Sequence, residues 1–325
     1  MMLCLHLFNR DYHGLFTPLI FIGKQPLSYY ISLFCDACVP IFAFVSGYGL
    51  YYKFKQNKAS YIKSKKIKLL KLYINYWIVL IIFALILGFF LMPERYPGSW
   101  SEFLLNFSGI DTSYNGAWWF FTTYIFFALT SKFWFQLLDY LPLFLYLSGL
   151  FIIYVIAFYF RIYKTNIFEN EMLIWLHRQL ALYFCTLFQF MLGAFALRYK
   201  WNTKFTGLFK AIKYKNVLIV AFMLVLVIFH AIIPNFIIAP FTAIGFIFLF
   251  MQLNLNKLFN AFLDYMSIHS TNMWLIHMFF YMVFFGTFVY SLKYPIFIFA
   301  VLVTMCLISS YLVNFINNKI VKAIL

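Results

Sequence analysis

The sequence predicts an all-α integral membrane protein, a bundle of about ten transmembrane helices of which the first is cut short. Of the 325 residues, 65% are hydrophobic and 24% aromatic, whereas only 10% are charged. The mean hydropathy is +0.87. A chain with so few charged residues cannot present a water-soluble surface, so its apolar stretches are expected to face lipid. Lipid offers no partners to backbone groups, and continuous helices satisfy those groups internally.

Each predicted span is an apolar stretch of about 20 residues, the length that crosses a hydrocarbon core of about 30 Å. Nine stretches qualify, at residues 31–52, 67–92, 117–137, 141–160, 179–198, 216–233, 236–252, 271–290 and 294–315. A further apolar stretch, residues 1–8, is too short to cross. No internal repeat, linker or soluble segment interrupts the series, and we expect a single membrane domain over residues 1–325.

Basic residues predict the orientation of these helices in the cell membrane. Two clusters surround the second and sixth connections: Lys53, Lys55, Lys58, Lys63, Lys65, Lys66, Lys68 and Lys71, then Arg198, Lys200, Lys204, Lys210, Lys213 and Lys215. Loops rich in lysine and arginine stay in the cytoplasm. We therefore expect loops 53–66 and 199–215 inside, loops 93–116 and 161–177 outside, and both termini in the cytoplasm.

The net charge of +16 is explained by this topology, because the chain has no soluble domain or basic arm that would bind nucleic acid. The lysines could also attract anionic membrane lipids. Cysteine usage adds little. Cys35-x-x-Cys38 has no second Cys or His pair near it, and we expect no metal site.

Polar residues open the predicted span 271–290, in the segment His269-Ser-Thr-Asn-Met-Trp-Leu-Ile-His277. On a helix His269 and Asn272 are neighbours, while His277 lies two turns further, about 12 Å along the axis. Polar side chains within a membrane generally face the bundle interior or a wet cavity, which makes them candidate site residues. The alternative is that the Ser-Thr-Asn run caps the helix at the cytoplasmic interface. Capping leaves His277 unexplained.

Aromatic residues gather at the outer start of the predicted span 117–137, in the segment Asn115-Gly-Ala-Trp-Trp-Phe-Phe-Thr-Thr-Tyr124. Trp118 and Trp119 fit the aromatic belt of a membrane protein, with each indole N–H among the headgroups. The alternative is an aromatic wall that stacks on a sugar ring. Asn115 and Tyr124 would then hydrogen-bond the sugar hydroxyls.

Together with Val39-Pro-Ile-Phe-Ala-Phe-Val-Ser-Gly-Tyr48 in the span 31–52, these two segments resemble integral membrane acyltransferase family 3. Its members acylate sugars of cell-surface polysaccharides. The resemblance implies a ten-helix core, a cytosolic acyl-CoA donor and an exported acceptor. It points to acetyl-CoA as the donor and to a polysaccharide or lipid-linked sugar as the acceptor, with no permanently bound cofactor.

The resemblance also gives a role to residues 1–8, because the first helix of the family ends in a histidine that closes an Arg-x10-His arrangement. His6 stands at that place, and the arginine would precede Met1. Either the start codon is placed too late or the protein has lost part of its active core. A stub of about 12 Å cannot cross a core of about 30 Å, which favours the first explanation. Imidazole suits acyl transfer as a base or as a nucleophile.

The expected donor site follows from the same family pattern. Members carry an Arg-x-x-Arg-like pair entering the third helix, and Lys65, Lys68 and Lys71 stand there in this chain. Lysine retains the charge for the phosphates of coenzyme A but loses the bidentate fork of arginine. We expect these lysines to bind the donor together with His269 and Asn272.

A catalytic pair is expected at the outer boundary, where His6 and Asp36 have similar predicted depths. Helices adjacent in sequence are usually neighbours, and Asp36 could accept a hydrogen bond from His6 and raise its basicity. The alternative is that Asp36 is solvated or caps a backbone group. His277, nearer the inner half, is the third expected catalytic residue.

The expected function is therefore a membrane O-acetyltransferase that acts on a cell-surface polysaccharide or its lipid-linked precursor. Two alternatives stay open. One is a transporter of a polysaccharide or lipid carrier, in which the same histidines line the path. The other is an inactive acyltransferase-like remnant.

Overall fold

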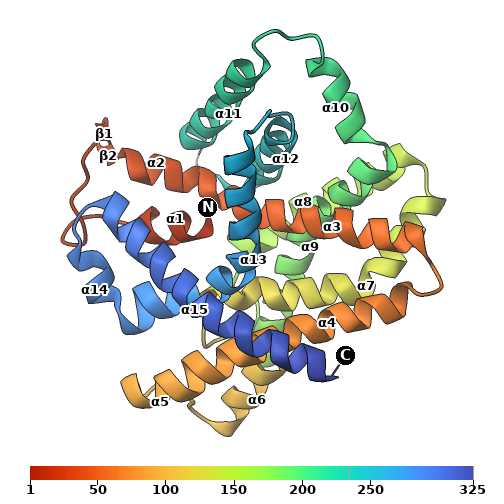
Figure 1. Cartoon of the computed structure of the whole chain (residues 1–325). Coiled ribbons are helices and arrows are strands. Elements are labelled where there is room, and N and C mark those ends of the chain that lie inside the picture. Colours follow the sequence, from red (N-terminus) through yellow and green to blue (C-terminus); the bar gives the residue numbers. More distant parts are fainter. Residues whose placement is uncertain (234, 325) are drawn as a thin grey trace. The chain divides into compact units, whose positions relative to one another are not determined.

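The computed structural model describes residues 1–233 and 235–324. It is 79% helical, as the all-α prediction requires. The sheet in this part of the chain is a hairpin of β1 (Phe21–Ile22) and β2 (Gln25–Pro26), paired antiparallel. Figure 1 shows the helices in chain order from α1 to α15.

Six helices are long and apolar enough to cross a membrane. Two are composite: Leu27–Gln56 joins α2 (Leu27–Phe34), the 3-10 turn η1 (Cys35–Ala37) and α3 (Cys38–Gln56), while Tyr61–Leu91 joins α4 (Tyr61–Val79), the π-helical η2 (Leu80–Leu87) and α5 (Gly88–Leu91). The other four are α8 (Leu143–Ile162), α9 (Glu171–Arg198), α11 (Lys215–Ile232) and α15 (Pro295–Ile324). The chain is a multi-pass membrane protein.

The expected count of about ten spans is not confirmed in the described residues. α7 (Trp119–Tyr140) and α13 (Lys257–Met278) are long enough, but charged and polar side chains interrupt both. α12 (Ala239–Phe250) has 12 residues, about 18 Å of helix, and α1 (Met2–Phe8) has 7. The remaining helices are short: α6 (Trp100–Ser108), η3 (Gly116–Trp118), α10 (Trp201–Phe209), η4 (Phe236–Ile238), η5 (Phe279–Phe284) and α14 (Gly286–Ser291).

The chain forms two compact units, each built from separate stretches of sequence. The first unit contains residues 1–36, 66–122 and 254–325, and the second contains residues 37–65 and 123–253. We describe each unit by itself. The single domain expected over residues 1–325 stays a prediction.

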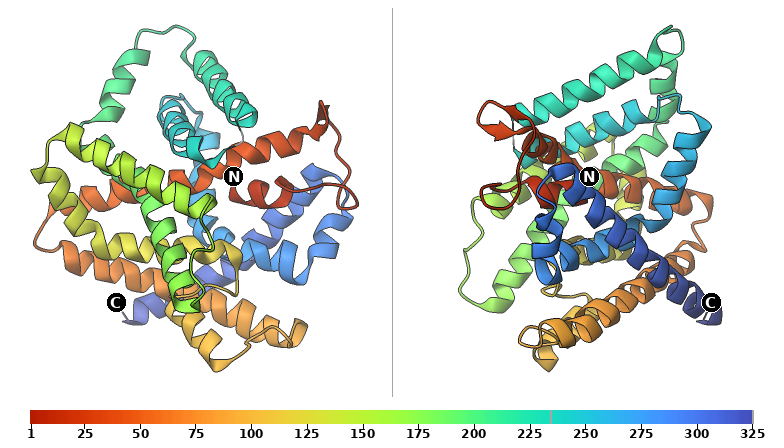
Figure 2. Two further views of the ribbon diagram at one scale, coloured as in Figure 1. Left: turned by 180° about the vertical axis from the view of Figure 1, so that it is seen from behind. Right: turned by 60° about the vertical axis from the view of Figure 1, so that its left-hand side comes forward.

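In the first unit, α13 lies at the centre of the packing. It contacts α15, α1 and the short turn η3, and α1 in turn contacts α2 and α15. The two views of Figure 2 show α13 beside α15. The first unit therefore brings both ends of the chain sequence to one long helix.

In the second unit, α3 packs along α9, and two glycines make this contact possible. A Cβ on Gly47 would overlap the carbonyl oxygen of Phe190, and a Cβ on Gly193 would overlap that of Phe44. Small residues let membrane helices approach until their backbones touch. Gly47 belongs to the Val39–Tyr48 segment, so this part of the motif has a packing role.

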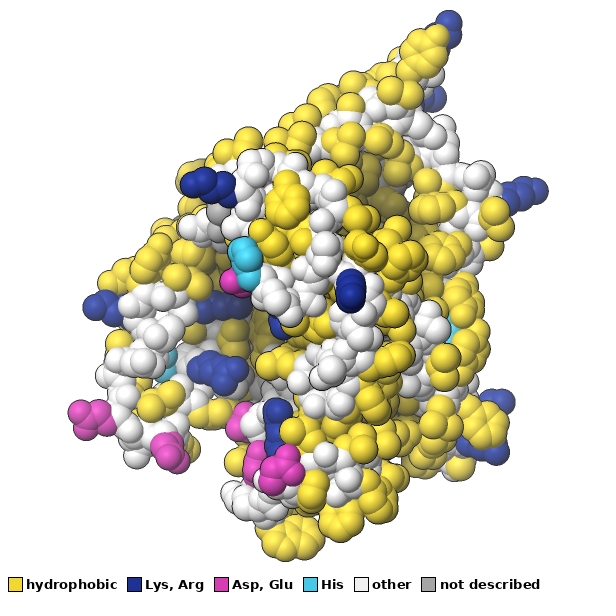
Figure 3. Space-filling view, turned by 90° about the vertical axis from the view of Figure 1, so that its left-hand side faces the viewer, with side chains coloured by type: hydrophobic (Ala, Val, Ile, Leu, Met, Phe, Trp, Pro, Cys, Tyr) yellow, Lys and Arg dark blue, Asp and Glu magenta, His cyan; other side chains and the backbone are white. Residues whose placement is uncertain are grey.

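Large apolar side chains remain exposed along several helices, which agrees with a membrane environment. Of the most apolar stretch of α11 only 11% is buried, and of that of α15 only 28%. Hydrophobic side chains dominate the face in Figure 3, with charged groups in small clusters. Water-soluble proteins rarely expose apolar patches of this extent, so these surfaces are suited to lipid.

Candidate active site

Two histidines from distant parts of the sequence meet in the first unit. His6 comes from α1 and His277 from the last turn of α13. His6 Nδ1 lies 2.9 Å from His277 Nε2, and the ring centroids are 5.0 Å apart. His277 is fully buried and His6 is partly exposed. One member of the pair is thus shielded from solvent, while the other keeps part of its surface exposed.

The hydrogen bonds of His277 determine the tautomers of both rings. His277 Nδ1 lies 2.8 Å from the carbonyl oxygen of Trp274 and 3.1 Å from that of Met273. A carbonyl only accepts, so Nδ1 must carry the proton. In a neutral His277 ring, Nε2 is then the acceptor, and His6 Nδ1–H donates to it. His6 Nε2 is left with its lone pair, as a general base requires.

Arg10 and Tyr281 complete the surroundings of the pair. An Arg10 nitrogen, NH2, donates to the carbonyl oxygen of His6 at 2.8 Å and lies 3.5 Å from the Tyr281 hydroxyl oxygen. Its guanidinium carbon is 5.2 Å from the centre of the Tyr281 ring. The Tyr281 ring is stacked on His277, with an interplanar angle of 14°. A permanent positive charge is therefore held beside the two imidazoles.

The aromatic segment around Trp118 clamps the helix that carries His277. Asn115 Nδ2 and the indole nitrogen of Trp118 both donate to the carbonyl oxygen of Leu275, at 3.1 and 2.7 Å. In the opposite direction, the indole nitrogen of Trp274 donates to the carbonyl oxygen of Ala117 at 2.9 Å. Three hydrogen bonds thus join η3 to α13 within one turn of His277.

The backbone of α13 becomes irregular at the same point, where the helix changes into the π-helical η5. The N–H of Phe279 points to the carbonyl oxygens of Ile276 and His277, and the Leu275 carbonyl takes the two side-chain donors instead. Single π-helical turns are rare and occur often at functional sites.

Comparison with known families identifies the family of the chain. The profile of the acyltransferase domain, the family 3 membrane type, matches residues 1–314. The chain belongs to acyltransferase family 3. No curated protein and no solved structure matches it. The protein is therefore a membrane acyltransferase, and the match extends from α1, which carries His6, through most of α15.

The structure changes two expectations about the positions of His269 and His277. α13 begins at Lys257, capped by Asn256, so the segment from His269 to Asn272 lies within a helix and does not cap one. His277 lies 20 residues from the helix start, about 30 Å along its axis. It is therefore at the far end from the predicted cytoplasmic side. It contacts His6 directly and does not lie in the opposite half of the membrane.

The His6 ring has a different partner from the one expected. Its Nδ1 is hydrogen-bonded to His277, whereas Asp36 lies in the turn η1, partly exposed. The membrane depths predicted from the sequence placed Asp36 near His6. They could not show that a histidine more than 250 positions away in the chain contacts His6. The catalytic role of Asp36 stays a prediction.

The tryptophan segment of the acyltransferase is not an exposed wall in the way the sequence suggested. Trp118 has no exposed surface and Asn115 is 2% exposed, because both point at the Leu275 carbonyl. Trp119 and Tyr124 keep part of their surface exposed. Trp118 and Asn115 therefore have a positioning role here, and sugar binding by Trp119 and Tyr124 stays a prediction.

His269 and Asn272 are cross-links between helices. Asn272 Oδ1 accepts from Asn75 of α4 at 2.7 Å, and its Nδ2 donates to Ser310 Oγ and Asn314 Oδ1 of α15 at 2.9 and 2.8 Å. His269 Nδ1 lies 2.9 Å from the same Ser310 oxygen. Both side chains are buried. Their polar groups are used within the protein, and donor binding by them stays a prediction.

The three lysines expected at the donor site have unequal surroundings on α4. Lys65 is 8% exposed, and its ammonium group lies 3.4 Å from the Leu129 carbonyl oxygen and 5.4 Å from the centre of the Tyr61 ring. Lys68 and Lys71 are exposed. Lys68 and Lys71 are thus the members that could reach a phosphate, whereas Lys65 links α4 to α7.

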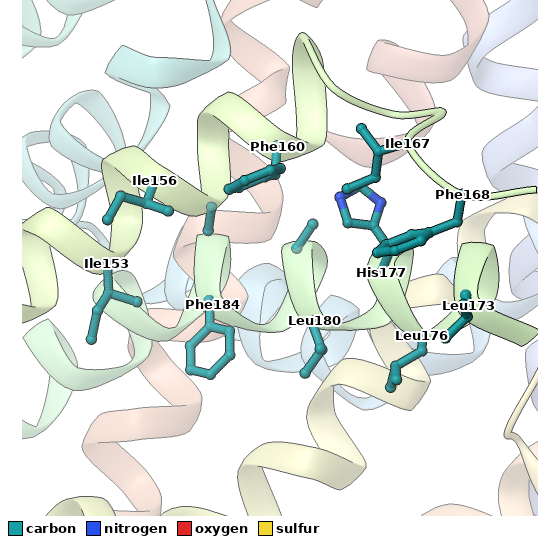
Figure 4. A pocket seen from close by; sticks show the side chains of 12 residues that line it. Ile153, Ile156, Phe160, Ile167, Phe168, Leu173, Leu176, His177, Leu180 and Phe184 are labelled. Carbon is teal, nitrogen blue, oxygen red and sulfur yellow. The ribbon is translucent and has the colours of Figure 1, made fainter.

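One cavity of the second unit is apolar and holds none of the expected site residues. It has a volume of about 510 Å³ between α8, α9 and the loop that joins them. Figure 4 shows His177 among Phe160, Ile167 and Phe168 on its wall. His177 Nε2 is buried without a hydrogen-bond partner. This cavity could hold an apolar chain, but it offers no catalytic pair.

Sequence reasoning missed Arg10, Tyr281, Asn75 and Ser310, all of which contact expected residues. Asn75 and Ser310 are polar residues inside predicted spans, which was a usable signal. Arg10 lies outside every predicted span, where basic residues are common. Tyr281 offered no signal in a chain with 25 tyrosines.

Proposed function

We propose that this acyltransferase moves an acetyl group from acetyl-CoA to a hydroxyl of a cell-surface polysaccharide or of its lipid-linked precursor. The observation that supports the proposal is the His6–His277 hydrogen bond, because it leaves Nε2 unprotonated on His6, the partly exposed member of the pair. Acyl transfer to an alcohol needs a base of this kind.

The reaction begins when the acceptor hydroxyl gives its proton to His6 Nε2. The hydroxyl oxygen attacks the thioester carbonyl carbon, and the tetrahedral intermediate carries negative charge on the former carbonyl oxygen. The carbon–sulfur bond then breaks, and protonated His6 returns the proton to the leaving thiolate. An ester and free coenzyme A result, and His6 is neutral again.

Each neighbour of His6 has a role in this sequence. His277 accepts from His6 Nδ1–H throughout, which fixes the tautomer and stabilises the imidazolium that forms. Arg10, hydrogen-bonded to the His6 carbonyl oxygen, supplies positive charge for the developing oxyanion. In this proposal the pair acts at the extracytoplasmic end of the first unit, and Lys68 and Lys71 meet the phosphates of the donor at the cytoplasmic end.

The experiment is an assay of acetyl transfer from radiolabelled acetyl-CoA in membranes that contain the full chain. His6→Ala should reduce transfer by about 10²- to 10⁴-fold, the usual contribution of a general base. His13→Ala is the matched control, because His13 is an exposed histidine that pairs with Asp11. Equal transfer by His6→Ala and the parent protein, at matched membrane levels, would refute the mechanism.

The same assay separates the proposed function from its alternatives. A transporter would move a saccharide or lipid carrier without consuming acetyl-CoA. A remnant would show no transfer in the parent protein. No observation in the structure favours either of these over transfer by the histidine pair.

A further inference from the structure

Three helices of the second unit end together around one carboxylate. Asp139, near the end of α7, is contacted by Lys55 near the end of α3 and by Arg198 at the end of α9. Lys55 Nζ lies 2.9 Å from each Asp139 oxygen, and an Arg198 nitrogen lies 2.7 Å from Oδ1. Lys58 Nζ is 3.5 Å from Oδ2, and the Tyr51 hydroxyl donates to Oδ1 at 3.1 Å. We call these five residues the Asp139 cluster.

The Asp139 cluster contains more positive than negative charge. Lys55, Lys58 and Arg198 surround a single carboxylate. The partial negative charges of three helix ends offset some of the surplus. The other acidic residues of this unit, Glu169 and Glu171, lie at the opposite end of α9, about 40 Å away along a helix of 28 residues. A further anion would therefore be attracted here.

The ionisation of Asp139 is also settled by its neighbours. Burial acts to raise the pKa of this carboxyl, but the hydrogen bond and charge of Lys55 and the hydrogen bond of Tyr51 outweigh it and hold the pKa below its usual value. Asp139 is thus an anion at neutral pH. Asp139 binds Lys55, Lys58 and Arg198 in the way that an external anion would.

A hollow adjoins the Asp139 cluster and has room for a ligand. Its volume is about 480 Å³, and it is lined by Tyr51, Tyr52, Lys55, Gln56, Leu197 and Arg198. Arg198 uses one nitrogen for Asp139 and for the Leu138 carbonyl oxygen, so further guanidinium N–H groups remain to donate. Arginine and lysine side chains that line a hollow suit a phosphate group.

We propose that this hollow binds an organic phosphate in the cytoplasm, held by Arg198 and Lys55, with Asp139 as the counter-ion that the phosphate partly replaces. Two sources have this chemistry. One is the phosphate groups of coenzyme A, which rests on the proposed function. The other is the headgroup of an anionic phospholipid in the cytoplasmic leaflet. The basic residues predict that α3, α7 and α9 all end on the cytoplasmic side.

The site differs from the lysines of α4. Lys68 and Lys71 are exposed side chains on one helix, whereas Lys55 and Arg198 come from two helices and are fixed by a shared carboxylate. Such fixed cations lose less conformational freedom when a ligand binds.

The test measures equilibrium binding to the purified full chain in nanodiscs of neutral lipid. Coenzyme A, 3′-dephospho-coenzyme A and, in separate nanodiscs, phosphatidylglycerol serve as probes. Lys55→Ala and Arg198→Lys should each weaken binding of the phosphate source about tenfold or more. Lys53→Ala is the matched control, because Lys53 also lies in the last turn of α3 but bonds Gln56 instead of Asp139.

Asp139→Asn gives the decisive comparison. If the cluster binds a phosphate, removal of the competing carboxylate should tighten binding several-fold. If the cluster only holds three helices together, the same change should leave binding unaltered while it lowers the melting temperature. Weaker or unchanged binding in a folded Asp139→Asn protein would overturn the proposal.

The probes identify the source. If 3′-dephospho-coenzyme A binds much more weakly than coenzyme A, the result would support the site and identify the 3′-phosphate of the donor as its ligand. If phosphatidylglycerol binds in a way that depends on Arg198, the result would support the site and identify a lipid headgroup as its ligand. If no probe responds to any variant, the hollow is not a phosphate site. Because binding is measured without turnover, this result is independent of the acetyl-transfer assay.

Discussion

At the scale of single residues, the chemistry of the site depends on which nitrogen of each imidazole carries a proton. His277 donates from Nδ1 to a helix carbonyl, so its Nε2 is the acceptor of the pair. His6 Nδ1 must therefore carry a proton. His277 takes the place that a carboxylate often occupies beside a catalytic histidine. A neutral ring accepts less strongly than a carboxylate. It carries no charge, however, so the pair places no negative charge in a buried position.

The first prediction concerns His277→Ala. Loss of the acceptor lets His6 adopt either tautomer and makes it a weaker base, so transfer should fall, although less than in His6→Ala. The acid limb of the pH–rate profile should move to lower pH, because a weaker base loses its proton at lower pH. Rates across pH 5–9 would show this shift. A uniform fall in rate with an unchanged profile would mean that His277 only supports packing.

At the scale of elements, η3 positions the end of α13 and α9 accommodates α3. The Leu275 carbonyl, released from the helix ladder at the start of η5, accepts two side-chain donors from η3. Buried carbonyl groups need such partners in the absence of water. The irregular helix and the tryptophan segment are therefore two parts of one structure.

The second prediction concerns Trp118→Phe. This change removes one donor to Leu275 while it keeps an aromatic ring, and it should destabilise the protein by about 1 kcal/mol. Transfer should fall through kcat, with little change in the acceptor KM, because Trp118 is buried and positions α13. Trp100→Phe is the control, since Trp100 is 80% exposed. A selective rise in acceptor KM would instead restore the sugar-stacking role.

The third prediction compares two glycines of α3. Gly47→Ala should lower the melting temperature in detergent, because the added Cβ would overlap the Phe190 backbone and overpacking typically costs about 1–3 kcal/mol. Gly49→Ala is the control two residues away, where a Cβ would meet nothing within 4 Å. It should be neutral or slightly stabilising. Equal melting temperatures for the two variants would contradict the close packing of α3 on α9.

At the scale of the whole molecule, the exposed apolar surface and the six long apolar helices define a multi-pass membrane protein. The two compact units each contain helices from separate parts of the sequence. The histidine pair belongs to the first unit, and the Asp139 cluster belongs to the second. The two polar clusters therefore lie on different sets of helices.

The fourth prediction concerns topology and tests the expected cytoplasmic termini. Single cysteines at Lys63, Lys204, Ser101 and Lys164, all exposed positions, would be introduced into a variant without the five native cysteines. A membrane-impermeant thiol reagent applied from outside should label positions 101 and 164 and spare positions 63 and 204. Labelling of position 63 or 204 in intact cells would reverse the orientation.

The sequence by itself determined the membrane class, the helical fold and the family, because each depends on composition or on contiguous motifs. Lipid forces apolar stretches into helices whatever their neighbours are. Local patterns also marked His6, His277 and Trp118 as important. They did not show how these residues contact one another.

Only the tertiary structure decided which polar groups meet. It paired His6 with His277 across 271 positions of sequence, joined Asn75 to Asn272, and brought the ends of α3 and α9 to Asp139. It also showed that Trp118 and Asn272 serve the fold through their hydrogen bonds. A hydrogen bond depends on the distance and direction between two groups, and helix packing sets both. A pattern along one segment contains neither.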